Sequence, residues 1–118
     1  MLEFYKSYSD SKIILDEMLI GSGVVVLRDV YPLDQINEAR AIVNKFADNQ
    51  EQKETHFNAE AAEAGTIHLQ QRVWNLFGKA EVFSTLITHN IIFDLMTKFL
   101  GTEFICGSYC ASRLLSGA

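Results

Sequence analysis

The stretch that decides the fold is GVVVLRD, which occupies residues 23–29. Its run of β-branched residues is typical of a buried strand. The chain then turns at Tyr31 to Asp34, where Pro32 suits the first turn of a helix. From Asp34 to about Ala47 an apolar residue recurs every three or four positions, which predicts an amphipathic helix. A strand followed at once by such a helix favours a fold of the α+β class.

A second helix is predicted on the N-terminal side of this strand. Ser9 to Ser11 provide a cap, and apolar residues then recur with helical spacing until Gly21, which is suited to end the helix. On the other side of the central helix, the polar stretch from Asp48 to about Ala64 is too long for a tight connection. It predicts a loop that is flexible or carries a minor helix.

The C-terminal half predicts a strand, a pair of helices and another strand. Gly65 to Phe77 alternates in part between apolar and polar residues, which indicates an extended segment. Glu81 to Leu100 predicts two helices separated near His89, with Asn90 as the cap of the second and Gly101 at its end. Glu103 to Leu115 predicts the last strand.

Composition limits the class of protein. The chain has 118 residues, 48% of them hydrophobic and eight of them Phe, which is enough for a core in one domain or part of one. Ten basic against 15 acidic residues give a net charge of −5, and without a basic stripe nucleic acid is not an expected partner. No apolar run approaches the roughly 20 residues of a membrane span, and the first residues lack a secretion signal. A cytoplasmic protein is the expectation.

The two cysteines, Cys106 and Cys110, fall in the last predicted strand. Four residues of strand separate them by about 13 Å, whereas a disulfide requires Cα atoms within about 7 Å. We therefore expect free, reduced core thiols.

Motifs of catalysis and metal binding are missing from these residues. None of the three histidines, His56, His68 and His89, belongs to a His-x-Asp or His-x-Glu pair, and none has a second histidine four residues away. They are expected to be surface or capping residues. Gly21-Ser22-Gly23 is not a nucleophile elbow, which requires Gly-x-Ser-x-Gly between a strand and a helix. No catalytic residue is assigned.

Three segments, in order, nevertheless resemble the phytanoyl-CoA dioxygenase family. The strand at 23–30, followed by a helix opening at Leu33-Asp34, is similar to the opening strand of that family. Arg72 to Leu76, followed by Val82-Phe83 and a helix ending Phe99-Leu100-Gly101, resembles the next part of its pattern. Phe104 to Ala118 looks like the strand that runs into a Pro-Gly turn in the family, with Ser116 where proline is usual.

The resemblance implies that residues 1–118 are the N-terminal part of an iron(II)- and 2-oxoglutarate-dependent dioxygenase that hydroxylates a small organic substrate. Its fold would be α+β, with N-terminal helices and the first strands of a double-stranded β-helix (jelly roll) that is incomplete in this chain. The family binds iron with a His-x-Asp pair and a distant histidine. These would lie beyond Ala118, so the 118 residues alone are expected to be inactive and to hold no cofactor.

The resemblance also offers three candidates for binding the dicarboxylate cosubstrate. Arg72 occupies a position where relatives often place a basic side chain, and a guanidinium can bind a carboxylate with two hydrogen bonds. Tyr109 and Arg113 share one face of the last predicted strand, and relatives use that face to line the cosubstrate pocket. The alternatives are that Arg72 forms a surface pair or stacks on Trp74, and that the other two side chains pack or are solvated. Trp74 and Phe83 are expected in the core.

Two other functions stay open from the sequence. One is a non-catalytic α+β module that binds a partner or self-associates. The other is a small-anion-binding domain that uses Arg72 and Arg113 without iron. The sequence leaves the substrate and the oligomeric state undetermined, because loops select substrates.

Overall fold

The computed structural model describes residues 2–4, 10–49, 60, 63–66 and 69–117. They divide into two compact units, which are considered separately. Unit 1 comprises residues 1–36 and 85–105, and unit 2 comprises residues 37–84 and 106–118. Helices α2 (Leu33–Asp48) and α4 (Glu81–Ile87) each contain residues of both units.

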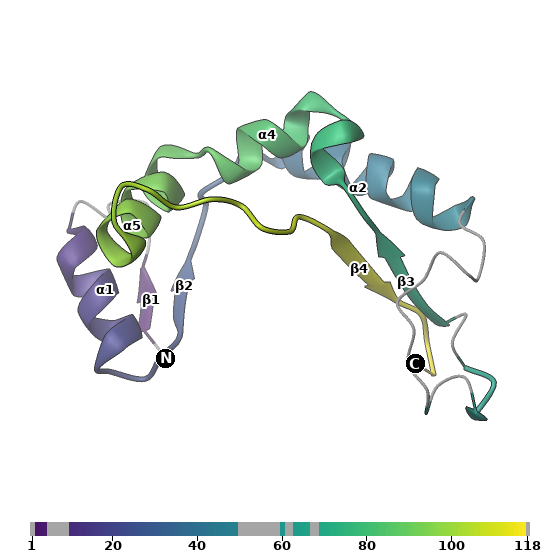
Figure 1. Cartoon of the computed structure of the whole chain (residues 1–118), viewed down its shortest axis with the longest axis horizontal. Helices are drawn as coiled ribbons and strands as arrows, with labels where there is room; N and C mark the ends of the chain where they lie inside the picture. The colour runs from purple at the N-terminus through teal and green to yellow at the C-terminus, as the bar shows by residue number, and fades with distance from the viewer. Residues whose placement is uncertain (1, 5–9, 50–59, 61–62, 67–68, 118) are drawn as a thin grey trace. The chain divides into compact units, whose positions relative to one another are not determined.

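Unit 1 opens with a strand, a helix and a second strand that pairs with the first. Strands β1 (Leu2–Phe4) and β2 (Val25–Leu27) are parallel, with Leu2 opposite Val25. Parallel neighbours require a crossover connection, and α1 (Ser11–Leu19) supplies it. Figure 1 shows α1 and α5 (Asn90–Leu100) beside this pair of strands.

The core of unit 1 lies where α1 and α5 meet. Ile14, Ile91 and Leu95 are buried there, each 9% exposed or less. Partly buried side chains of α1, α5, β2 and the loop that follows β2 surround them: Leu15, Met18, Val25, Leu27, Val30, Ile92 and Met96. Polar contacts of Lys98 also connect α1 with α5. Its ammonium lies 2.5 Å from the Ser11 hydroxyl of α1 and 2.8 Å from the Asp94 carboxylate of α5.

The ends of these helices follow the predicted signals, with one correction. The Asp10 carboxylate accepts a hydrogen bond from the Lys12 amide and caps α1. The cap of α5 is His89, whose Nδ1 accepts from the Ile91 amide, so the prediction that Asn90 is the cap was wrong by one residue. An imidazole nitrogen can accept in this position, as a carboxylate does. Gly101 ends the helix as predicted, with a φ of 90°.

Unit 2 contains a two-stranded antiparallel sheet, which we call the ribbon. It consists of β3 (Gln70–Val73) and β4 (Ala111–Leu114), with Gln71 opposite Arg113 and Arg72 opposite Ser112. A single 3₁₀ turn, η3 (Leu76–Gly78), leads from β3 to α4. Val73, Leu76, Val82 and Phe83 are buried in this unit, which confirms the prediction for Phe83.

The strands are shorter than the sequence predicts. Residues 23–29, 65–77 and 103–115 were each expected to be extended, but only 25–27, 70–73 and 111–114 pair. Alternating or β-branched residues favour an extended backbone, yet a strand forms only where a partner offers its amides and carbonyls. The jelly roll stays a prediction, because each sheet among the described residues has two strands.

Other predictions fall on single side chains. Cys106 and Cys110 are free as expected, but neither lies in a strand, and Cys106 is exposed, so it is not a core thiol. Trp74 is 44% exposed, which makes the core prediction wrong for this residue. Most of the predicted loop at 48–64 lies outside the described residues. Within them, no helix combines the length and the apolar character needed to cross a membrane.

Candidate functional site

The three predicted cosubstrate-binding residues all belong to unit 2, and two of them lie on the ribbon. Arg72 is in β3, Arg113 is in β4, and Tyr109 precedes β4 by two positions. Side chains alternate between the faces of a strand. Since Gln71, the neighbour of Arg72, is opposite Arg113, the register places the two arginines on opposite faces of the ribbon.

Arg113 is held by three side-chain contacts on its face. Its Nε donates to Gln71 Oε1 at 2.6 Å, and one terminal nitrogen donates to Asn44 Oδ1 at 3.0 Å. The other terminal nitrogen forms an ion pair with Asp48 at 2.6 Å, with 23% of the Arg113 side chain exposed. Asn44 and Asp48 belong to α2, so Arg113 ties this helix to the ribbon.

Arg72 lies on the other face and has different neighbours. Its Nε donates to the Ser112 hydroxyl at 3.2 Å, across the ribbon. Its guanidinium carbon lies 5.3 Å from the centre of the Trp74 ring, within the range of a cation–π contact. The predicted alternative, stacking on Trp74, is therefore confirmed, and the guanidinium is partly oriented by these two side chains.

Tyr109 packs among aromatic rings. Its ring centre lies 5.1 Å from that of Phe77 and 6.2 Å from that of Phe83. Its carbonyl accepts a hydrogen bond from the Leu76 amide at 3.2 Å. The predicted common strand face with Arg113 does not form, because β4 begins only at Ala111.

This geometry bears on anion binding. Two guanidiniums on opposite faces of a ribbon cannot close on one small anion, so a joint site of Arg72 and Arg113 is not favoured. Three of the five N–H donors of Arg113 are directed to Gln71, Asn44 and Asp48, which hold its guanidinium against α2.

The described residues do not fit an iron site. None of them form a group of three or more histidine, cysteine, aspartate or glutamate side chains that could hold a metal ion. His89 caps α5 and its ring contacts that of Tyr31, with centres 5.2 Å apart. The predictions for His56 and His68 concern residues outside those described.

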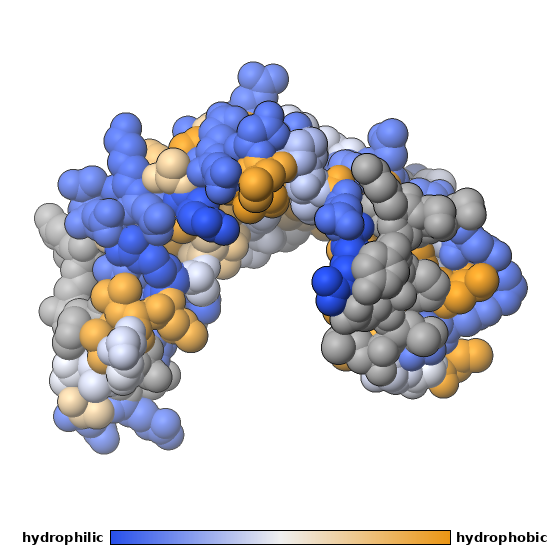
Figure 2. Space-filling model, turned by 180° about the vertical axis from the view of Figure 1, so that it is seen from behind, coloured by the Kyte–Doolittle hydropathy of each residue, from blue (hydrophilic) through white to orange (hydrophobic). Residues whose placement is uncertain are grey.

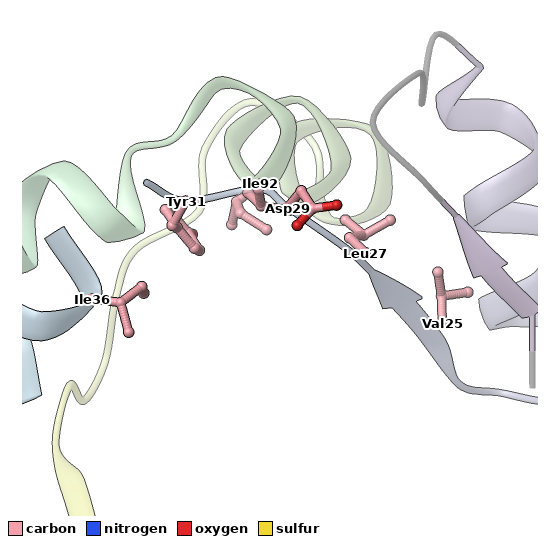
Figure 3. Close-up of a pocket in the computed structure, with 7 residues that line it drawn as sticks. Val25, Leu27, Asp29, Tyr31, Ile36 and Ile92 are labelled. Carbon is pink, nitrogen blue, oxygen red and sulfur yellow. The ribbon is translucent and has the colours of Figure 1, made fainter. Parts of the chain in front are cut away.

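Unit 1 has a hollow of its own beside β2, with a volume of about 480 Å³. Figure 3 shows its lining, in which the Asp29 carboxylate stands among mostly apolar side chains. The Tyr31 hydroxyl is engaged, since it donates to the Leu86 carbonyl at 2.7 Å. The lining residues are Val25, Leu27, Asp29, Val30, Tyr31, Ile36 and Ile92. Several of them also border the core of unit 1, so the hollow is the open margin of that core.

Three carboxylate or ammonium groups on helices of unit 1 have shifted pKa values. The pKa of Glu17 is lowered, chiefly by a hydrogen bond from the Ser22 hydroxyl. A hydrogen bond from Lys98 lowers the pKa of Asp94, and one to Asp16 raises the pKa of Lys12. In each case the hydrogen-bond partner lies in the same helix or in the turn that follows it. These shifts therefore reflect local helix contacts and do not indicate a reactive group.

The sequence also did not predict a hollow of about 400 Å³ in unit 2 with aromatic walls. It joins residues that lie about thirty positions apart in the sequence: Trp74, Asn75, Phe77, Cys106, Gly107, Ser108 and Tyr109. The only local signal was the density of aromatic residues at 74–77. Their proximity to Tyr109 depends on the ribbon register.

Comparisons with protein-family models, with curated proteins and with solved structures find no match for this chain. A function therefore has to be argued from its own residues.

Proposed function

We propose that this chain is the N-terminal part of an iron(II)- and 2-oxoglutarate-dependent dioxygenase of the phytanoyl-CoA dioxygenase type, acting on a small organic substrate. The observation that carries the proposal is the two-sided character of the ribbon. One face bears Arg113, which is bonded to α2, together with the buried Val73. The other face bears Arg72, the exposed Ser112 and Leu114, which is 70% exposed.

A jelly roll requires this kind of asymmetry. Its two sheets pack face to face, so each sheet has an inner face that meets the other sheet and an outer face that can carry helices. The face toward α2 corresponds to an outer face in this proposal. The face with Arg72 would then look into the barrel and toward the cosubstrate. This departs from the family pattern, in which the face of the last strand that corresponds to Arg113 lines the cosubstrate pocket.

Arg72 is the residue that would contact the cosubstrate. Its guanidinium is planar and permanently charged, and it can give two parallel hydrogen bonds to one carboxylate of 2-oxoglutarate. Trp74 and Ser112 would orient it. Arg113 would have a structural role through Asn44 and Asp48, and Tyr109 would pack against Phe77.

Iron has no site among the described residues, so no reaction step is assigned to this chain. Its ligands would have to come from sequence outside these 118 residues. The proposal accordingly gives the chain two tasks: to support the sheet from outside and to present Arg72 to its inner face. Taken alone, the chain is expected to be inactive.

The coding sequence after Ala118 provides the first test. A His-x-Asp pair shortly after that codon is expected, followed by a distant histidine. If the reading frame continues without such a pair, or stops, the proposal is wrong.

Binding of 2-oxoglutarate by the longer product provides the second test. Arg72→Lys should weaken binding by about tenfold, because one charged donor replaces a two-pronged one. Arg40→Lys serves as the matched control, since Arg40 is exposed on α2. Equal affinity in both variants would remove Arg72 from the cosubstrate site.

A second candidate is a non-catalytic module that binds a partner or self-associates. It is favoured by large apolar side chains that remain exposed among the described residues, such as Ile105 at 89% and Ile20 at 86%. Figure 2 shows apolar patches of this kind on the face in view. Where such side chains form a contiguous patch, the exposed apolar surface is typical of an interaction site or of an incomplete fold.

Size-exclusion chromatography and a thermal melt of the 118-residue chain separate these candidates. A module should melt cooperatively as a monomer or as a defined oligomer. A piece of a jelly roll should melt broadly and form open-ended aggregates through its unpaired strand edges.

A further inference from the structure

The hollow of unit 2 with aromatic walls, which we call the aromatic hollow, is not a binding site in the proposed function, although its residue Trp74 orients Arg72 there. It lies between the end of β3 with η3 on one side and residues 106–109 on the other. The hydrogen bond from the Leu76 amide to the Tyr109 carbonyl joins these two segments. Its volume of about 400 Å³ is within the range of small-molecule pockets.

Three aromatic side chains line the aromatic hollow and leave ring surface uncovered. Trp74 and Phe77 are each 44% exposed. Phe77 and Tyr109 meet at 60°, so their rings form a corner. Buried Phe83 supports Tyr109 edge-on, and the Arg72 guanidinium lies over Trp74. Rings that are held in this way lose little freedom when another ring stacks on them.

The polar side chains that line the aromatic hollow indicate which charge a ligand can carry. It offers the amide of Asn75, the hydroxyl of Ser108 and the thiol of Cys106, and none of its side chains is charged. Such a lining can donate and accept hydrogen bonds at the edge of a ring. These side chains do not compensate the lost hydration of an ionised group, and the Arg72 guanidinium over Trp74 repels a cation, so the lining favours a neutral ring.

We propose that the aromatic hollow binds a neutral, planar heteroaromatic ring of about the size of a nucleobase. The ring stacks on the walls made by Trp74, Phe77 and Tyr109. Its hydrogen-bonding edge meets Asn75 and Ser108. A single stacked ring supports a dissociation constant on the order of millimolar. The inference does not depend on the oxygenase proposal, because it uses neither iron nor 2-oxoglutarate.

The protein carries its own probe of this site, since Trp74 is its one tryptophan. Uracil and 5,6-dihydrouracil are titrated into the 118-residue chain while Trp74 fluorescence is recorded. Both compounds are neutral and present the same imide edge, but only uracil has a flat conjugated ring. Uracil should quench Trp74 fluorescence in a saturable way. Its half-saturating concentration should be about one fifth or less of that of dihydrouracil.

A variant of Phe77 locates the binding. Phe77→Leu retains an apolar side chain and removes the ring, so it should raise the half-saturating concentration of uracil about fivefold and leave that of dihydrouracil unchanged. Phe99→Leu is the matched control, because Phe99 is 46% exposed and lies in α5. It should have no effect.

The comparison of the two compounds on the unaltered chain needs no variant, so it stands even if Phe77→Leu unfolds. Equal half-saturation by uracil and dihydrouracil, or quenching that rises linearly without saturation, would overturn the proposal. An identical loss of uracil binding in the folded Phe77→Leu and Phe99→Leu variants would overturn it as well.

Discussion

Replacing Arg113 with methionine should remove three polar contacts and keep most of the apolar stem. The contacts are those with Gln71, Asn44 and Asp48, all within 3.0 Å. They connect the ribbon to α2, so the perturbation tests whether Arg113 stabilises unit 2 and is not reserved for a ligand.

The expected magnitude follows from the exposure of the partners. The bonds to the two neutral amide oxygens are charge-assisted and partly buried, and each contributes about 1 kcal/mol. The Asp48 carboxylate is 64% exposed, so its ion pair adds less than about 1 kcal/mol after solvent screening. Arg113→Met should therefore lower the free energy of unfolding by about 2–3 kcal/mol.

Urea denaturation, followed by Trp74 fluorescence and by circular dichroism, measures this change. Asp48→Asn alone should cost less than about 1 kcal/mol, and should cost almost nothing once Arg113 is methionine. Arg40→Met is the control for loss of an exposed arginine on α2. If Arg113→Met is no more destabilising than Arg40→Met, within about 0.5 kcal/mol, the structural role of Arg113 is refuted.

Three further predictions concern unit 1. Gly101→Ala should destabilise by about 1–3 kcal/mol in a thermal melt, because φ is 90° there, whereas Gly107→Ala, at an ordinary φ in open space, should not. The pKa of Glu17 lies below its ordinary value of 4.5, chiefly because its carboxylate accepts a hydrogen bond from Ser22. The ionised carboxylate therefore stabilises the folded chain above pH 4.5, and this stabilisation is lost as the pH falls through the lowered pKa. Glu17→Gln should accordingly flatten the fall in melting temperature between neutral pH and about pH 3; an unchanged slope would contradict this. Tyr31→Phe removes a 2.7 Å hydrogen bond to a carbonyl of α4 and should cost about 1 kcal/mol in a urea titration, and no change would show that solvent replaces it.

The helices could be predicted closely because their signals are local. The central helix was expected from Asp34 to about Ala47 and runs from Leu33 to Asp48. At α1, apolar periodicity, the Asp10 carboxylate before the first turn and Gly21 after the last are all contained in a dozen consecutive residues. The shift of the α5 cap from Asn90 to His89 is small, because either side chain can accept from the first free amides.

The strands could not be predicted as well, because their ends depend on distant partners. Leu2 to Phe4 carry no strand signal of their own, and β1 exists through its pairing with Val25 to Leu27. Residues 103–110 have the apolar residues of a strand, but among the described residues no strand pairs with them, although the Tyr109 carbonyl accepts a hydrogen bond from the Leu76 amide. The burial of Trp74 could not be predicted from local sequence either. This residue follows the last residue of β3 and precedes Asn75, whose φ of 52° turns the chain, so hydropathy alone misplaced it.

The arginines of the ribbon show what register adds to sequence. In the sequence, Arg72 is the first candidate for binding an anion and Arg113 a second one, and each sits in a predicted strand or extended segment. Pairing Gln71 with Arg113 separates them, because a shift of one residue in a strand moves a side chain to the other face. One guanidinium then contacts α2 and the other contacts Trp74. A shared anion site would require a register shifted by one, which would also turn Ala111 away from Val73 and toward solvent. Loss of that apolar contact next to buried Val73 opposes the shift, so the packing that holds the ribbon together also assigns Arg72 and Arg113 to different tasks.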